Sequence, residues 1–379
     1  MRIGIICYPT FGGSGVVATE LGKELAMKGH DVHFITYDLP VRFDHFLSNL
    51  HYHEVRVSNY PLFDYQPYEL VLASRIVDVV KHEKLDLLHV HYAIPHASAA
   101  FMAREILKSQ GIHVPFVTTL HGTDITLVGK DASFEPVITF AINQSDAVTA
   151  VSESLKQDTF EHFSINREIQ VIPNFIDLKR YQGCSTEGVL KAFAPNNEKI
   201  LFHASNFRPV KRVEDVVSIF SKVRKEMPVK LLLAGDGPER SKIEALCREL
   251  GTCEDIHFLG KIKNIEEVYS VADLFLLPSE TESFGLAALE AMASGVPVIS
   301  TNTGGIPEVN EHGVTGFLSN VGDVEDMTKN ALKLLQDGSL RAEFKKSTYL
   351  KAKQFSKESV IPVYEELYQN VLKKKTISA

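Results

Sequence analysis

The stretch RIGIICYPTFGGSGVVATELGKELAMKGHDVHFITYD, residues 2–38, holds the pattern that decides the fold. Residues 2–9 are a short apolar run ending at a proline, which is typical of a buried parallel strand. A glycine-rich turn follows, and residues 16–30 then show helical spacing with Gly29 as the stop signal. Residues 31–38 form a second apolar run. This order of strand, helix and strand predicts a βαβ unit.

The same alternation continues along the first half of the chain and then starts again. Further strands are predicted at residues 85–93, 115–122 and 146–152, and in the second half at residues 199–207, 229–237, 256–262, 273–279 and 296–301. Helical segments separate them, for example at residues 213–227 and 238–250. The sequence therefore predicts an α/β protein of two doubly wound, Rossmann-like domains that face each other across a cleft.

The boundary between the two domains is expected where the alternation breaks. Pro173 and Asn174 interrupt the segment at residues 169–181. We therefore expect an N-terminal domain at residues 1–170 and a C-terminal domain at residues 171–359. The last helix, at residues 360–379, carries an apolar stripe that must pack on something, and we expect it to complete the N-terminal domain.

Composition narrows the possible partners. The chain has 379 residues, too many for one core, with 44% hydrophobic and 23% charged residues. The net charge of −8, without a dense basic block before residues 373–375, argues against nucleic acid or an anionic membrane as a partner. The start of the chain does not resemble a signal peptide, and the four cysteines lack metal-site spacing. A cytoplasmic protein is expected, and its oligomeric state, a homo-oligomer included, is left open.

Ligands of open α/β sheets bind at the carboxyl ends of the strands, so the functional residues are expected there. Gly13 and Ser14 belong to a GGSG turn that opens a helix and can approach an anionic ligand. A simple tight turn is the alternative. The turn is not GxGxxG, but Asp38 after the second strand keeps a dinucleotide site possible.

Two aromatic side chains of the first half also follow strands. His121 ends the predicted strand at residues 115–122, and Tyr92 follows LLHVH. A histidine at a strand end faces the cleft, although a core or capping histidine is about as common. A structural tyrosine is equally compatible with the position of Tyr92.

Basic residues follow the first strand of the second half. Arg208, Lys211 and Arg212 cluster in the segment SNFRPVKR. Such cations suit a diphosphate through charge-assisted hydrogen bonds, and a solvated run of charges is the alternative.

The segment TESFGLAALEAM, residues 281–292, places Glu282 in a loop and Glu290 inside the helix that follows. The amides of Phe284, Gly285 and Leu286 stand between them at the positive end of the helix, which suits a phosphate. Carboxylates bind vicinal hydroxyls well. One carboxylate for a ribose, one for a second sugar and amides for the diphosphate together predict a nucleotide-sugar site.

The region ESFGLAALEAMASGVPVISTNTGGIPEV, residues 282–309, resembles the E-x7-E signature of retaining family-4 glycosyltransferases of the GT-B type. The GGSG turn, GH before the second strand, VIPNFID and GDGPE extend the resemblance over essentially the whole chain. Lys211 matches the family lysine. Asn206 stands where the family usually has arginine, and the resemblance leaves Arg208 to replace it.

The resemblance implies roles for individual residues. Glu290 would bind the ribose hydroxyls and Glu282 the 3-hydroxyl of the sugar, Lys211 and Arg208 the diphosphate, and His121 the transferred sugar. The implied catalytic set is His121, Lys211, Arg208 and Glu282. The implied donor contacts are Gly13, Ser14, Asn206, Ile262, Phe284, Gly285, Leu286 and Glu290, and the implied acceptor contacts are Ser14, Tyr92, Thr119, His121 and Asn174.

Within that family, residues 7–22, 91–97, 118–126 and 205–212 resemble members that act on UDP-GlcNAc and L-malate in the first step of bacillithiol synthesis. Nothing in spacing or periodicity shows malate. A family-4 enzyme with a sugar, inositol phosphate or lipid acceptor, an NAD(P)-dependent oxidoreductase and a non-catalytic nucleotide-sugar sensor are the alternatives. No D-x-D occurs in the chain, so no metal and no cofactor are expected at the diphosphate.

Overall fold

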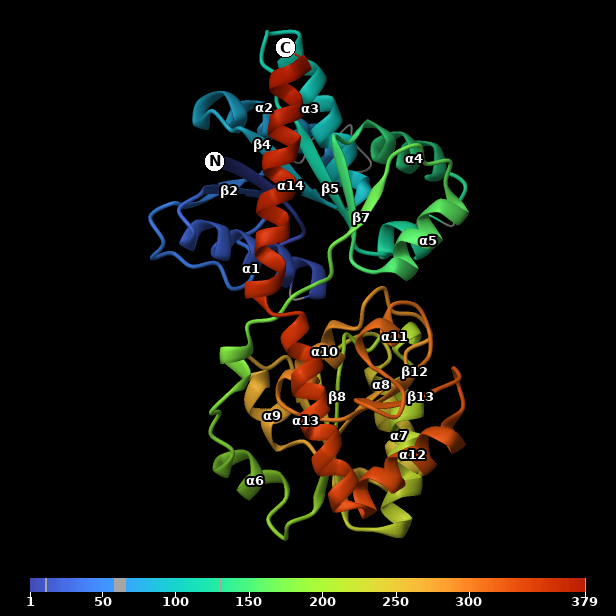
Figure 1. Ribbon diagram of the computed structural model, residues 1–379. Helices are drawn as coiled ribbons and strands as arrows, with labels where there is room; N and C mark the ends of the chain where they lie inside the picture. Colours follow the sequence, from blue (N-terminus) through green and yellow to red (C-terminus); the bar gives the residue numbers. More distant parts are fainter. Residues whose placement is uncertain (11, 58–65, 128, 130, 379) are drawn as a thin grey trace. The chain divides into compact units, whose positions relative to one another are not determined.

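The computed structural model describes residues 1–10, 12–57, 66–127, 129 and 131–378. The chain divides into two compact units (Figure 1). Unit 1 is Met1–Asn174 with Lys357–Ala379, and unit 2 is Phe175–Ser356. Each unit is an α/β domain with its own parallel sheet.

The sheet of unit 1 has seven parallel strands. Their spatial order is β3 (Leu50–Glu54), β2 (Asp31–Thr36), β1 (Arg2–Ile6), β4 (Leu87–His91), β5 (Phe116–Leu120), β6 (Ala147–Ala150) and β7 (Ile169–Val171). The direction of this order reverses between β1 and β4. Such a switch point opens a crevice at the carboxyl ends of the two strands, which makes it the natural place for a ligand.

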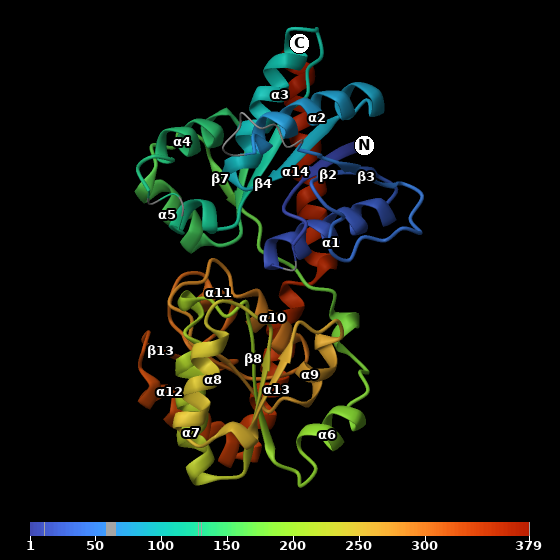
Figure 2. The ribbon, with the colours of Figure 1, turned by 180° about the vertical axis from the view of Figure 1, so that it is seen from behind.

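Helices cover both faces of this sheet (Figures 1 and 2). They are α1 (Gly13–Met27), α2 (Tyr68–Glu83), α3 (Ser98–Lys108), α4 (Glu135–Gln144), α5 (Glu153–His162) and α14 (Lys357–Ser378), with short turns η1 (Ala93–Ala97) and η2 (Thr123–Leu127). The apolar residues of α2 and α3 share one core with those of β1, β2 and β4. α1 and α14 pack against each other.

Helix α14 is the last element of the chain, yet it belongs to unit 1. Tyr364 and Tyr368 are buried, and the Tyr368 hydroxyl lies 2.7 Å from His89 Nδ1 on β4. Glu365 accepts hydrogen bonds from Lys28 at 2.6 Å and pairs with His30 at 3.0 Å, just beyond α1. The apolar stripe of this helix thus packs on the sheet of unit 1.

The sheet of unit 2 has six parallel strands. Their order is β10 (Ile256–Gly260), β9 (Val229–Ala234), β8 (Lys199–Ala204), β11 (Leu274–Leu277), β12 (Val298–Thr301) and β13 (Gly316–Ser319), so the switch point lies between β8 and β11. The helices are α6 (Glu187–Phe193), α7 (Val213–Glu226), α8 (Arg240–Glu249), α9 (Ile265–Val271), α10 (Leu286–Ala293), α11 (Ile306–Val309), α12 (Val324–Gln336) and α13 (Gly338–Gln354), with short turns η4 (Leu178–Tyr181), η5 (Pro209–Lys211) and η6 (Cys253–Asp255).

The predicted α/β class and its parallel strands are confirmed, but several elements carry no clear sequence signal. Strand β3, LHYHE, lies at the sheet edge and is half-buried, so it lacks the apolar run of a central strand. Strand β13, GFLS, has only four residues. Such elements form because a neighbouring strand supplies their hydrogen bonds.

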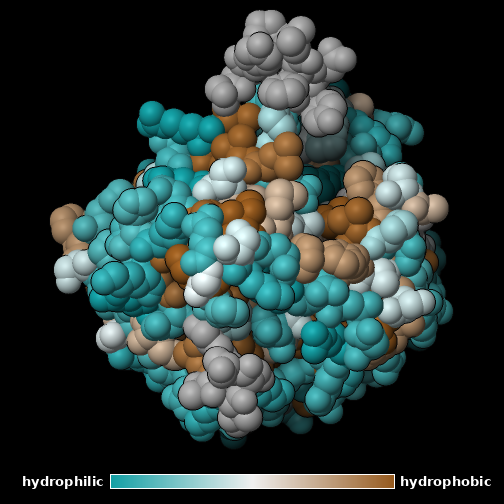
Figure 3. All heavy atoms as spheres, turned by 90° about the horizontal axis from the view of Figure 1, so that it is seen from above, coloured by the Kyte–Doolittle hydropathy of each residue, from teal (hydrophilic) through white to brown (hydrophobic). Residues whose placement is uncertain are grey.

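No helix in the described part of the chain is long and apolar enough to cross a membrane. In the face shown in Figure 3, hydrophilic residues predominate and hydrophobic residues form small separate groups.

Candidate active site

The switch point of unit 2 brings together the two segments that the sequence singled out. The loop after β8 leads into η5 with Lys211, and the loop after β11 carries Glu282. Lys211 Nζ lies 2.6 Å from Glu282 Oε1, and both side chains are mostly buried. Ser279 Oγ donates a second hydrogen bond, of 2.9 Å, to the same oxygen. The pair is therefore held in place by the fold before any ligand binds.

Two glycines fix the backbone of Glu282. The amide of Gly305 donates to the Glu282 carbonyl at 2.8 Å. A Cβ on Gly304 would lie 2.1 Å from this carbonyl oxygen, and one on Gly305 would lie 2.4 Å from the Ser283 oxygen. Only glycine allows so close an approach. Gly304 and Gly305 thus fix the position of the loop that carries Glu282, the first glutamate of the signature.

Glu290 lies on α10 between two tyrosines. The Tyr181 hydroxyl donates to Glu290 Oε1 at 3.0 Å, and the Tyr269 hydroxyl donates to Oε2 at 3.1 Å. Both rings are buried, and burial followed by the charge of Glu290 raises the pKa of Tyr269. Tyr269 therefore remains a donor, and the two hydroxyls hold the carboxylate in one orientation.

The start of α10 lies between the two glutamates. Phe284 is buried, and Gly285 caps the helix in the left-handed conformation with φ of 89°. The first amides of a helix have no acceptor within the helix, and they stand at the positive end of its dipole. Gly285 and the half-buried Leu286 thus begin a potential phosphate site, as the sequence predicts.

Three other predicted donor contacts occupy more open positions. Asn206 and Arg208 follow β8 and are exposed, while Ile262 follows β10 and is half-buried. The backbone at Asn206 packs closely against Gly237, because a Cβ on Gly237 would lie 2.1 Å from the carbonyl oxygen of Asn206. The GDG loop after β9 therefore supports the basic loop after β8.

In unit 1, Tyr92 and Ser14 meet at the switch point between β1 and β4. The Tyr92 hydroxyl donates to Ser14 Oγ at 2.6 Å. Tyr92 adopts φ of 84°, which is unusual for a residue with a side chain. A Cβ on Gly15 would lie 2.5 Å from the carbonyl oxygen of Tyr8. The tight turn at this position therefore requires a glycine. Gly13 is exposed at the start of α1.

His121 follows β5 and lies next to a second histidine. His121 Nε2 is 2.8 Å from His91 Nδ1, and the two rings stack with their centres 5.0 Å apart. Burial, followed by the charge of His96, lowers the pKa of His121 to about 3. His121 is therefore a neutral hydrogen-bonding group at pH 7, not a cation.

Two predicted acceptor contacts lie away from the surface. Thr119 is fully buried, and its Oγ1 lies 2.7 Å from His89 Nε2 and 2.6 Å from Thr149 Oγ1. Its side chain belongs to a polar network inside the sheet layer, and its carbonyl accepts from the amide of Tyr92 at 2.9 Å. Asn174 is buried at the last position of the first segment of unit 1.

Sequence reasoning missed four residues of these sites. They are His91, Asp124, Tyr181 and Tyr269. Asp124 is buried and accepts from the amides of Ala93 and Gly122 at 2.8 and 3.1 Å, and burial raises its pKa to about 6. Its place in HGTDIT, beside His121, could have indicated it. The other three depend on tertiary contacts and leave no local signal.

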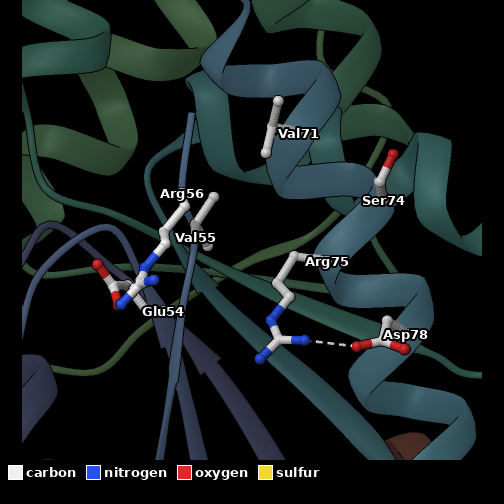
Figure 4. A pocket seen from close by; sticks show the side chains of 7 residues that line it. All are labelled: Glu54, Val55, Arg56, Val71, Ser74, Arg75 and Asp78. Atoms are coloured by element: carbon white, nitrogen blue, oxygen red, sulfur yellow. Dashed lines mark hydrogen bonds and ion pairs between the residues drawn. The ribbon is translucent and has the colours of Figure 1, made fainter. Parts of the chain in front are cut away.

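Other features of unit 1 do not coincide with these residues. A cavity of about 620 Å³ lies between the end of β3 and α2, with Arg75 paired to Asp78 (Figure 4). None of the predicted site residues lines it. Asp38, considered for a dinucleotide, accepts from the adjacent amide of Leu39 at 2.7 Å.

Comparison with known proteins identifies the family. Residues 11–180 match the family model Glycosyltransferase Family 4, and residues 190–351 match Glycosyl transferases group 1. The chain is 48% identical, over 98% of both sequences, to N-acetyl-alpha-D-glucosaminyl L-malate synthase of Bacillus anthracis. The chain belongs to the family-4 glycosyltransferases. The protein is therefore a glycosyltransferase, and the alternative of an NAD(P)-dependent oxidoreductase is wrong.

More distant members of the family act on other substrates. An alpha-monoglucosyldiacylglycerol synthase of Acholeplasma laidlawii is 25% identical over 99% of this glycosyltransferase and 98% of the relative. Among solved structures, sucrose-phosphate synthase of Thermosynechococcus elongatus has a TM-score of 0.83 at 21% identity, covering 99% and 100% of the two chains. The glycosyltransferase WaaG has a TM-score of 0.75 at 17% identity, covering 97% and 99%. These structures confirm the predicted GT-B fold.

Proposed function

We propose that this glycosyltransferase moves N-acetylglucosamine from UDP-GlcNAc to the hydroxyl of L-malate, with retention at the anomeric carbon. The observation that carries the proposal is the 48% identity, across 98% of both chains, to the Bacillus anthracis enzyme with that name. The two glutamates, the lysine and the helix start of unit 2 support the nucleotide-sugar part of it. The four cysteines are free thiols, which fits a cytoplasmic enzyme.

The donor nucleotide is assigned to unit 2. Glu290 would accept hydrogen bonds from the two ribose hydroxyls, in the orientation in which Tyr181 and Tyr269 hold its carboxylate. A carboxylate fixed from both sides pays little entropy on binding, so these bonds should be strong for their type.

The diphosphate would lie between the basic loop and the start of α10. Lys211 has three N–H donors, and one of them is directed to Glu282. The remaining donors, with Arg208 and the free amides at Gly285, can bind phosphate oxygens. Glu282 would bind the 3-hydroxyl of the sugar while it holds the lysine.

Bond cleavage at the anomeric carbon places negative charge on the departing phosphate. Fixed cations and amides directed at this phosphate stabilise the transition state more than the ground state. The departing phosphate can then take the proton of the malate hydroxyl as that oxygen attacks from the same face, which gives retention without an enzyme nucleophile. Because Lys211 and Arg208 supply the positive charge, transfer is expected to survive EDTA.

The acceptor is assigned to unit 1. L-Malate carries two carboxylates, and the exposed start of α1 with Gly13 and Ser14 is suited to an anion. Tyr92, bonded to Ser14, would order this turn. His121 is neutral and can exchange a hydrogen bond with the transferred sugar without adding charge there.

A mass-spectrometric assay tests the proposal. Purified protein is incubated with UDP-GlcNAc and, separately, L-malate, D-malate, glycerate, inositol phosphate and diacylglycerol. The expected product is N-acetylglucosaminyl malate with UDP, formed fastest from L-malate. Efficient transfer to another acceptor, with none to L-malate, would refute the assignment of the acceptor and leave the family unchanged. A parallel assay with UDP-glucose tests the donor.

A further inference from the structure

A group of histidines and carboxylates in unit 1 lies apart from the transfer site. Asp31 and His33 are on β2, and His51 and His53 are on β3. His33 and His51 are register partners, and side chains two residues apart share a face of a strand. All four therefore project from one face of the sheet. Asp31 is the first residue of β2, so the group begins at the amino edge, opposite to the strand ends that carry the transfer site.

The distances within this group are close to those of a metal centre. Asp31 Oδ1 lies 2.8 Å from His51 Nε2, and Asp31 Oδ2 lies 3.6 Å from His33 Nε2. The ligand atoms of the three residues all lie within 4.8 Å of one another. In a tetrahedral zinc centre with bonds of about 2.0 Å, ligand atoms are about 3.3 Å apart. Shifts of roughly half an ångström would therefore give this geometry.

His33 supplies the observation that points to a ligand. Its side chain is buried, and Nε2 has no hydrogen-bond partner among the residues that the structure describes. The 3.6 Å to Asp31 is too long for a hydrogen bond. The other ring nitrogen, Nδ1, lies 2.9 Å from His53 Nε2. When Nδ1–H donates to His53, Nε2 presents a lone pair toward Asp31, the arrangement that second hydrogen bonds give to metal-bound histidines.

The kinds of ligand atom in this group indicate the class of metal. The three residues offer two imidazole nitrogens and one carboxylate oxygen. Imidazole nitrogens with one carboxylate favour zinc-like ions over Mg²⁺ or Ca²⁺, which prefer oxygen.

We propose that Asp31, His33 and His51 bind a divalent transition-metal ion of the zinc class, which ties the edge strand β3 to β2. His53 is the positioning residue that orients His33. The side chains of Asp31 and His51 are 39% and 40% exposed, so the ion can enter from solvent and keep a water as its fourth ligand. The Arg2 guanidinium, 3.9 Å from Asp31, shares the carboxylate with the ion. The proposal does not depend on the acceptor assigned above.

Zn²⁺ binding to the full chain without an affinity tag tests it. After chelation and removal of EDTA, equilibrium dialysis against Zn²⁺ is expected to give one tightly held ion per chain. His51→Gln and Asp31→Asn should weaken this binding by about 100-fold or more, and His53→Gln by about 10–100-fold. His162→Gln is the matched control, because His162 is exposed on α5 and its ring lies against the Asp158 carbonyl of the same helix.

Thermal unfolding provides a second measurement. Zn²⁺ should raise the Tm of the wild type and of His162→Gln, and leave that of His51→Gln unchanged. His51 and Asp31 are partly exposed, so these variants should fold even if a change at buried His33 does not. Absence of tight Zn²⁺ binding, or equal binding in folded His51→Gln, overturns the proposal. If Zn²⁺ bound to the exposed Cys253 instead, wild type and His51→Gln would bind it equally.

Discussion

Gly304→Ala tests whether the glycine pair seats Glu282 for catalysis. An added Cβ would lie 2.1 Å from the Glu282 carbonyl oxygen, whereas real contacts of this kind are essentially never below 3.0 Å. The carbonyl belongs to backbone, so the loop must move by about 1 Å, and a displacement of that size can lower activity about 10²-fold. Since Glu282 holds Lys211, both groups should lose their alignment. We expect kcat/KM to fall by about that factor while the variant remains folded.

Gly313→Ala is the matched control. Gly304 and Gly313 both have positive φ, of 56° and 77°, so alanine is strained at either position, by roughly 1–2 kcal/mol. At Gly313, however, nothing lies within 4 Å of the added Cβ. Transfer to L-malate is measured under steady-state conditions, and stability by denaturant unfolding. If both variants lose similar stability and keep similar kcat/KM, the seating of Glu282 by Gly304 is refuted.

Three further predictions concern single side chains. Lys211→Ala should lower kcat about 10²–10³-fold, with partial recovery in Lys211→Arg, and a kcat within about twofold of wild type would remove Lys211 from the phosphate site. Glu290→Gln should weaken UDP binding in calorimetry by about 1.5–3 kcal/mol, and equal affinity in the folded variant would contradict the ribose contact. Burial, followed by the charge of His121, lowers the pKa of His89 to about 3, so the stability it contributes is complete above pH 6.5 and is lost as pH falls toward 3. His89→Gln should therefore reduce the pH slope of the unfolding free energy, between about pH 4 and 6, by up to about 1.4 kcal/mol per pH unit, and equal slopes in denaturant titrations would disprove this.

The sequence by itself determined the fold class and the residues of the candidate nucleotide-sugar site. Parallel strands covered on both faces need short apolar runs, and the helices between them need 3.6-residue spacing, so both signals are local. Strand ends follow from the same pattern, and Lys211, Glu282 and His121 were predicted to follow strand ends, where ligands of open α/β sheets bind. The start of α10 could be predicted in the same way, because the signals for it lie within one short segment after Pro278.

Only the tertiary structure decided which of these side chains meet. Lys211 and Glu282 are 71 positions apart, and they touch because β8 and β11 are neighbours at the switch point of the sheet. Strand order is a choice among long-range pairings, and no local spacing encodes it.

The tyrosines that orient Glu290 could not be predicted either, because their contacts with it are also long-range. Tyr181 and Tyr269 reach Glu290 from 109 and 21 positions away, and neither tyrosine has a neighbouring motif that marks it. Thr119 lies beside His121 in sequence but points into the layer between strand and helix, because both faces of a covered parallel sheet are interior and alternation no longer separates buried from accessible positions.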